Sequence, residues 1–389
     1  MSDSASGRFD AFIVGAGPAG SHMAFLLASQ GCRVAIIDKD RFPRQKVCGG
    51  GVSRKALDLL DTDLGSVVHR RIGGAFLTFA NRQTLIKDVS PSVGVTVVRS
   101  EFDAFLLDRA LAAGAILLPQ TTFLAATDSA VGIDIDTDAG RHHSRLLFAA
   151  DGAASSVRRH VFGSRIVGCA PALEALVPAS PEKIESLADR AVFDFDVGGG
   201  YGWIFPKRDH LNVGVFAPYS QRPLRAELQR FMARYACLQT AAAPRRFGFP
   251  IPLRNLAGQY QRGRTWLLGD AAGLAESLFG EGIYFALKSA TLAAAAIARD
   301  GFAADSRRYT DLLRGELLPE LRAAARIARL IYRFPRFAFN HCVLNPQVNE
   351  DFAGLIDGSV GYRQCLRRNL LQPHRWLVPG RPSMAAASL

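Results

Sequence analysis

A glycine-rich turn near the start of the chain constrains its fold more than any other feature. Residues 10–14 are almost entirely apolar and predict a buried strand, and residues 18–30 have the pattern of a helix. Between them lies GAGPAG at residues 15–20, and a second apolar strand at residues 33–37 ends on Asp38. This order of strand, turn, helix, strand and acid is typical of the dinucleotide-binding unit of a Rossmann-type fold.

Each glycine of this turn has a physical task. Gly15 permits the tight turn, Gly17 lets the backbone approach a pyrophosphate, and Gly20 lets helix and strand pack closely. The phosphates then meet unbonded N–H groups at the positive end of the helix. Asp38 lies where a carboxylate accepts from ribose hydroxyls, which argues against a 2′-phosphate. The unit predicts a dinucleotide, but it does not distinguish NAD from FAD.

Three later segments resemble the other parts of a flavin site. ADGAASSVR at residues 150–158 resembles the Asp-Gly motif of flavin-dependent hydroxylases and their relatives. GDAAG at residues 269–273 resembles the GDAAG motif of the same proteins. Arg99 matches the arginine that precedes the helix of their FAD domain. The resemblance implies bound FAD, with Asp270 holding the ribityl hydroxyls and the backbone near Gly282 approaching the flavin ring.

Three more segments narrow this resemblance to the geranylgeranyl reductase family. FPRQKVCGGG at residues 42–51 resembles the family's PxxKxCGG loop, YGWIFPK at residues 201–207 matches its YxWxFPK signature, and GEGI at residues 280–283 matches a further segment. One departure is Ser277, which stands where the family usually has proline. The resemblance implies a two-domain flavoprotein that reduces isolated double bonds in prenyl chains or prenylated lipids.

The resemblance also implies the residues of the site. The residues expected to contact FAD are Gly15, Ala16, Gly17, Gly20, Asp38, Cys48, Gly49, Gly51, Arg99, Phe123, Asp270, Gly282 and Ile283. Those expected on the catalytic side are Cys48, Tyr201, Trp203 and Glu281. Tyr201 and Trp203 alternate on a predicted strand and share one face, either as the wall of an apolar tunnel or as core aromatics. Cys48 is either a thiol on the substrate side or a small residue in a glycine loop. Cys48, Tyr201 and Glu281 are the candidate proton donors.

The order of the segments predicts the architecture. We expect an α/β fold with a Rossmann-type FAD-binding domain, an inserted antiparallel-sheet substrate domain and a helical C-terminal region. Short β-like runs that alternate with glycine at residues 191–216 indicate the second sheet. The expected boundaries are 1–72, 97–160 and 262–300 for the FAD-binding domain, 73–96 and 161–261 for the substrate domain, and 301–389 for the C-terminal region.

A strong positive charge suggests a partner. The formal net charge is +12, and no nucleic-acid-binding signature accompanies it, so we expect no nucleic-acid partner. Four arginines recur at helical spacing beside apolar residues: Arg322, Arg326, Arg329 and Arg333. This pattern is typical of a helix at an anionic membrane surface, and an ordinary solvated arginine face is the alternative.

Cysteine spacing and hydropathy set the expected compartment. The six cysteines lie far apart without a CxxC pair, so we expect neither a structural metal nor a disulfide framework. No apolar run reaches the ~18 residues that span a bilayer, and residues 1–8 lack the apolar core of a secretory signal. We therefore expect a cytoplasmic protein with peripheral contact at the inner face of the membrane.

Three functions remain open at this stage. The first is an FAD-dependent reductase that delivers hydride to the double bonds of a hydrophobic or lipid substrate, with NADPH or a ferredoxin as electron donor. The second is a flavin-dependent monooxygenase, hydroxylase or halogenase, because a fold does not fix a reaction. The third is a flavin-binding redox partner protein without its own substrate. The oligomeric state is not indicated.

Overall fold

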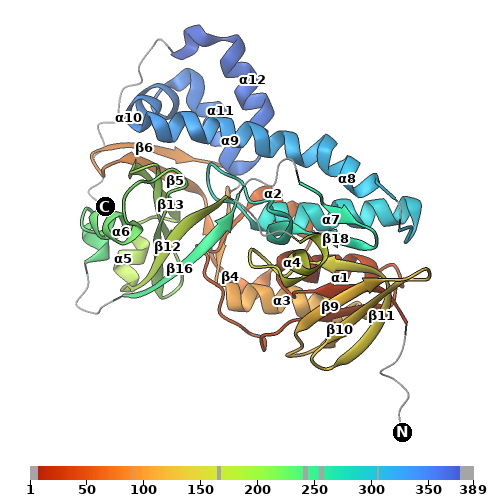
Figure 1. Ribbon diagram of the computed structural model, residues 1–389. Helices are drawn as coiled ribbons and strands as arrows, with labels where there is room; N and C mark the ends of the chain where they lie inside the picture. Colours follow the sequence, from red (N-terminus) through yellow and green to blue (C-terminus); the bar gives the residue numbers. More distant parts are fainter. Residues whose placement is uncertain are drawn as a thin grey trace.

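A computed structural model of the chain describes residues 8–90, 92–163, 168–239, 244–253, 258–304 and 306–376 (Figure 1). Nearly all of the segment at residues 1–8, and the last residues of the chain, lie outside this part. Within it the strands form two large sheets and one small sheet, and a group of helices follows at the C-terminal end.

The first large sheet carries the dinucleotide-binding unit. Its order is β17-β18-β11-β1-β2-β8, and β10 and β9 continue antiparallel from β11. The five strands from β18 to β8 run parallel. The strands are β1 (Phe9–Val14), β2 (Val34–Ile37), β8 (Ile116–Leu118), β9 (Phe123–Asp128), β10 (Ile133–Thr137), β11 (Gly140–Ala149), β17 (Gln261–Arg262) and β18 (Thr265–Leu267). Every residue of β2 is buried, as expected for a parallel sheet covered on both faces.

Helix α1 (Pro18–Ala28) begins directly after the glycine turn. It packs against α7 (Ile283–Asp300) and α3 (Arg99–Ala112). A Cβ atom at position 20 would overlap the carbonyl oxygen of Gly15, so Gly20 permits the close approach of α1 to the turn. Arg99, expected just before a helix, is the first residue of α3.

The second large sheet has the order β16-β12-β15-β14-β13-β5-β6. Its neighbouring strands are antiparallel except for the parallel pair of β5 and β13. The strands are β5 (Gly74–Phe79), β6 (Gln83–Asp88), β12 (Cys169–Pro178), β13 (Arg190–Val197), β14 (Gly200–Pro206), β15 (His210–Phe216) and β16 (Arg245–Pro252). The predicted second, largely antiparallel sheet is thus confirmed. The small sheet consists of β3 (Gly51–Ser53), β7 (Gly94–Val97) and β4 (Val68–Ile72), beside α2 (Arg54–Leu60).

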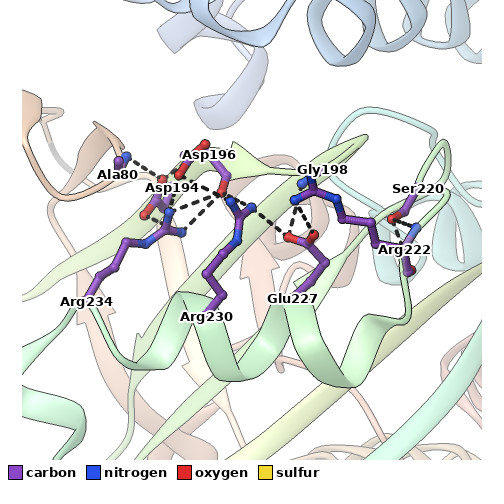
Figure 2. Close-up of polar contacts among 9 residues, drawn as sticks. All are labelled: Ala80, Asp194, Asp196, Gly198, Ser220, Arg222, Glu227, Arg230 and Arg234. Atoms are coloured by element: carbon purple, nitrogen blue, oxygen red, sulfur yellow. Dashed lines mark hydrogen bonds and ion pairs between the residues drawn. The ribbon is translucent and has the colours of Figure 1, made fainter.

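Helix α6 (Leu224–Met232) covers one face of the second sheet, and α5 (Pro181–Glu185) lies nearby (Figure 1). Figure 2 shows the ion pairs that tie α6 and the residues after it to β13. Arg234 pairs with the buried Asp194 at 3.2 Å and with Asp196, and Arg230 of α6 lies 4.0 Å from Asp196. These contacts fix α6 behind the sheet and leave the opposite face for other elements.

The C-terminal helices lie across both sheets (Figure 1). They are α8 (Arg308–Leu312), α9 (Leu318–Arg333), α10 (Pro335–Ala338), α11 (Pro346–Asp357) and α12 (Tyr362–Leu371). Shorter segments of the chain are α4 (Ser156–Phe162), η1 (Gly65–Val67), η2 (Ala236–Leu238), η3 (Gly269–Ala272), η4 (Leu313–Leu317), η5 (Phe339–Val343) and η6 (Pro373–Trp376). The predicted helical C-terminal region is confirmed. Among the described helices, none combines the length and the apolar character needed to cross a membrane.

Candidate active site

A cavity of about 750 Å³ extends from the glycine turn to the aromatic face of the second sheet. All the residues expected to contact FAD line it except Ala16 and Gly20, and so do the four expected on the catalytic side. Leu355 and Ile356 of α11 line it as well. The folded chain therefore brings the predicted residues, together with two residues of the C-terminal region, to one cavity.

The dinucleotide end of the cavity is built around the start of α1. Gly17 is the N-cap residue and makes no side-chain cap, so N–H groups of the first turn keep room for an anion. The Asp38 carboxylate accepts a hydrogen bond from the Ala16 backbone at 2.8 Å, which fixes it beside the turn. Arg44, which the sequence pattern did not single out, lies 3.7 Å from Asp38 and 3.4 Å from the buried Asp103. Because a Cβ at Gly17 would lie 3.4 Å from the Arg44 guanidinium, a pyrophosphate here would meet a cation.

The next part of the cavity joins the Asp-Gly and GDAAG motifs. One carboxylate oxygen of Asp151 accepts from the backbone of Ser156 at 2.7 Å and from Val157 at 3.2 Å, at the start of α4. Its other oxygen, Oδ1, is buried and has no hydrogen-bond partner among the described residues. Arg158 donates to the carbonyl of Ala271 at 3.0 Å and so links the two motifs. An orphaned acceptor on a cavity wall fits a ligand that carries hydroxyl groups, as FAD does.

Asp270 and the start of α7 form the adjoining wall. Burial raises the pKa of the Asp270 carboxyl, and the positive charges of Lys46 and Arg99 oppose this rise. Gly282 is the N-cap residue of α7 and lacks a side-chain cap, and a Cβ there would lie 3.5 Å from Asp270 Oδ1. An uncapped helix start beside a carboxylate offers both a donor and an acceptor to a polar ligand.

Arg99 is held in place by a buried ion pair. It donates to both oxygens of Asp103, at 2.7 and 2.8 Å. Burial alone would lower the pKa of Arg99, but the Asp103 charge and the Cys48 side chain raise it. Phe123, also expected at the cofactor, is the first residue of β9 and is buried at the cavity wall.

The CGGG loop lies against the second sheet and is held by one buried lysine. Lys207 is 1% exposed, and its ammonium donates to the carbonyls of Gly49 at 2.9 Å, Gly50 at 3.3 Å and Val97 at 2.7 Å. Burial lowers the pKa of Lys207 to about 7. Gly50 has φ +65°, which favours glycine. Lys207 thus fixes the backbone that directly follows Cys48 and joins it to β7.

Tyr201 and Trp203 share one face of β14, as predicted, and form an aromatic wall. Their ring centroids lie 6.1 Å apart. Tyr201 donates its hydroxyl to the carbonyl of Phe279 at 2.7 Å, and burial raises the pKa of this phenol. Trp203 donates its indole N–H to Asn212 at 2.8 Å. The other aromatic residues that line the cavity on this side are Phe193, Phe205, Phe216, Phe249 and Phe279.

Known proteins resemble this chain in sequence. Residues 8–174 match the family described as FAD binding domain. The chain is 30% identical over 356 residues to the menaquinone reductase of Mycolicibacterium smegmatis, across 85% of this chain and 86% of that protein. It is 29% identical over 287 residues to the geranylgeranyl diphosphate reductase of Rhodobacter capsulatus, across 72% of each. The chain belongs to the geranylgeranyl reductase family. It is an FAD-dependent oxidoreductase.

Solved structures agree on the fold of this family. A geranylgeranyl bacteriochlorophyll reductase-like protein from Thermoplasma acidophilum superposes with a TM-score of 0.74 at 20% identity, over 95% of this chain and 97% of that one. A halogenase superposes with a TM-score of 0.71 at 16% identity, over 92% of this chain and 85% of that one. At such identities the likeness shows the fold and leaves the reaction open.

The loop around Ser277, where the chain departs from the geranylgeranyl reductase pattern, is held in place by buried side chains. Glu276, fully buried, accepts from the backbone of Phe279 at 2.8 Å and from that of Leu278. Tyr332 of α9 donates to the carbonyl of Leu278. Burial raises the pKa of Glu276 to about 7. These bonds fix the loop around Ser277, where the family usually has proline.

Glu281, a candidate proton donor, lines the cavity but is engaged by neighbouring side chains. Its two oxygens meet the Lys55 ammonium at 2.6 Å and the Ser53 hydroxyl at 2.6 Å. Lys55 also lies 4.5 Å from the ring centre of Tyr284. Because both carboxylate oxygens of Glu281 already have partners, the case for Glu281 as a donor is weaker.

Proposed function

We propose that this protein is a reductase that saturates carbon–carbon double bonds in a prenyl chain or prenylated lipid. The observation that carries this proposal is the continuity of the cavity, in which the flavin residues lead directly to a wall of aromatic rings. A largely apolar wall suits a hydrocarbon chain, since it excludes water. The names of the two relatives, geranylgeranyl diphosphate reductase and menaquinone reductase, point the same way.

The proposed division of labour follows from the geometry. Reduced FAD, when bound, supplies the hydride, and NADPH or a ferredoxin re-reduces it in this proposal. Residues at the glycine turn and around Asp270 hold the cofactor, while Tyr201 and Trp203 orient the alkene. Cys48 lies between these two groups in the loop that Lys207 fixes. An unactivated alkene has no polar handle, so the placement of a proton donor is the main catalytic task of the chain.

A second candidate function is a flavin-dependent monooxygenase or halogenase. The halogenase that superposes over 92% of this chain supports it. The CGGG loop and the YxWxFPK signature favour the reductase. A redox partner without its own substrate is the third candidate, and the aromatic cavity argues against it because such a protein needs no apolar tunnel.

Oxygen dependence separates the first two candidates. The purified protein, its flavin reduced with dithionite, is mixed with geranylgeranyl diphosphate or a menaquinone in an anaerobic cell. The reductase predicts reoxidation of the flavin at 450 nm and a saturated product without oxygen. A hydroxylated or halogenated product that forms only in air would replace the proposal with the monooxygenase or halogenase. Flavin that stays reduced with both substrates would contradict it.

We also propose contact with a membrane surface. Arg322, Arg326, Arg329 and Arg333 are all exposed on α9, whose other face is buried. Leu330, Phe334 and Phe337 are exposed beside them. Charged and apolar side chains together suit an anionic bilayer, where a lipid substrate would reside.

A further inference from the structure

One carboxyl group interrupts the aromatic face of the second sheet. Glu174 of β12 lies opposite Gly214 of β15, and Gly214 lies opposite Trp203 of β14. A Cβ at Gly214 would overlap the indole of Trp203, so the indole lies across this position towards Glu174. Glu174 lines the same cavity as Trp203 and is 4% exposed.

Neutral groups hold this carboxyl in place. Asn212 donates from its amide to Glu174 at 3.2 Å and accepts from the indole of Trp203 at 2.8 Å. The backbone of Cys48 also hydrogen-bonds to the Glu174 carboxylate. Among the described residues, no lysine or arginine forms an ion pair with it within 4.0 Å. The carboxyl therefore lies directly under the CGGG loop without a paired cation.

The other acids of the cavity differ from Glu174 in this respect. Glu281 is paired with Lys55, and one oxygen of Asp151 caps α4. Asp270 lies at the polar end, where Lys46 and Arg99 face it. Glu174 thus differs from these acids in lying among the aromatic side chains that would contact a hydrocarbon chain.

We propose that Glu174 is the proton donor of the active site, held beside Cys48 and Trp203 by Asn212. This inference rests on the proposed function. Burial raises the pKa of the Glu174 carboxyl. Its hydrogen bonds and the more distant positive charges of Lys207 and Arg99 act to lower this pKa, but burial has the larger effect. A raised pKa keeps the proton available closer to neutral pH, as a general acid requires.

The proposed step balances in atoms and electrons. The alkene gains a hydride, with its electron pair, at one carbon and the Glu174 proton at the other. The π bond breaks as two C–H bonds form, and the flavin that supplied the hydride is left oxidised. The Glu174 carboxylate then regains a proton from water.

A first test reads the ionisation of Glu174 without substrate. Infrared difference spectroscopy follows the C=O stretch of protonated carboxyl groups in the FAD-loaded protein against pH. Because burial raises the pKa of Glu174, part of this band at neutral pH is expected to belong to Glu174 and to be lost in Glu174→Gln. Glu227→Gln is the matched control and should keep the wild-type band, because Glu227 is an equally buried glutamate on α6 behind the same sheet (Figure 2). A band of equal size at neutral pH in Glu174→Gln and the wild type would overturn the inference.

A second test reads the proton transfer. Reoxidation of the reduced flavin by a prenyl substrate is expected to slow ~10²-fold in Glu174→Gln, to recover in part in Glu174→Asp, and to stay unchanged in Glu227→Gln. The wild-type rate should fall as pH rises, and this fall should be absent in Glu174→Gln. Flavin content and melting temperature of each variant exclude a folding defect. A wild type that reacts and a Glu174→Gln variant that reacts equally fast overturn the Glu174 inference alone. A wild type that no prenyl substrate reoxidises contradicts the proposed function and, with it, the donor role.

Discussion

Single buried polar residues organise the backbone of the site. The ammonium of Lys207 binds three carbonyls of the CGGG loop and β7, and the Glu276 carboxylate binds two N–H groups of the next loop. Each replaces hydrogen bonds that these backbone groups would otherwise make with water. A buried ion pair between the side chains of Arg99 and Asp103 holds the start of α3. The cavity is therefore shaped by buried charges that contact backbone groups or one another rather than solvent.

The pH dependence of stability tests the environment of Lys207. Its pKa is about 7 in the folded protein and 10.5 in the unfolded chain. Between these values the unfolded chain binds the proton and the folded protein does not, so this residue makes stability rise with pH, by at most about 1.4 kcal/mol per pH unit. Urea unfolding from pH 7 to 9 should show this rise in the wild type and in Lys39→Met, an exposed control, and lose it in Lys207→Met. Parallel profiles for all three proteins would show that Lys207 titrates as an ordinary lysine.

The Cys48 thiol is expected to affect turnover rather than folding. It lies in a loop whose backbone is held by Lys207 and Asn212, so the side chain itself carries little of the structure. Cys48→Ser should keep its FAD content and its melting temperature while the rate of substrate reduction changes. Unchanged rates on every accepted substrate would assign the thiol a packing role only.

The positions of residues that follow a local sequence pattern could be predicted. The positions of residues that depend on the pairing of distant strands could not. Tyr201 and Trp203 alternate within one strand, so their shared face follows from the period of a strand. The site of Glu174 depends on the pairing of β12 with β15, which lie far apart in the chain, and no local spacing reveals it. The contact of Arg44 with Asp103 was likewise not predictable, because the two residues lie far apart in the chain.

At the scale of elements, α9 combines two faces with different tasks. Its buried face includes Tyr332, whose hydroxyl donates to the loop around Ser277. Its exposed face carries Arg322, Arg326, Arg329 and Arg333, here called the arginine stripe. Before α9 the chain forms α8 and then a π-helical segment at η4. Pro319 lies in the first turn of α9, where a backbone N–H would have no partner within the helix. The position of this proline therefore favours the start of a separate helix here.

The arginine stripe predicts salt-sensitive binding to anionic membranes. Each surface arginine contributes on the order of 1 kcal/mol near anionic lipid, and salt weakens the attraction. Changing Arg322, Arg326, Arg329 and Arg333 to Gln should abolish most co-sedimentation with phosphatidylglycerol liposomes at low salt. The control changes an equal number of exposed arginines on other elements: Arg41, Arg225, Arg245 and Arg246. Equal sedimentation of the stripe variant and the wild type would leave the stripe as a solvated helix face.

At the scale of the whole molecule, the cavity exists only because separate regions meet. Its lining draws on the first sheet, the second sheet and α11. The Rossmann-type unit and the motifs that follow it were predictable, because tight turns and close backbone approaches demand glycine at fixed spacings. The contribution of Leu355 and Ile356 was not predictable, because it depends on how the C-terminal helices pack across the sheets.

One measurement tests the central claim most directly: an anaerobic single turnover in ²H₂O with dithionite-reduced protein and a geranylgeranyl substrate. The N–H of reduced flavin and the acid of the site both exchange with solvent, so each saturated double bond should gain two deuterium atoms. The account predicts one equivalent of oxidised flavin for each double bond saturated, with the corresponding mass increase in the product. Substrate recovered at its original mass beside flavin that has stayed reduced would contradict it.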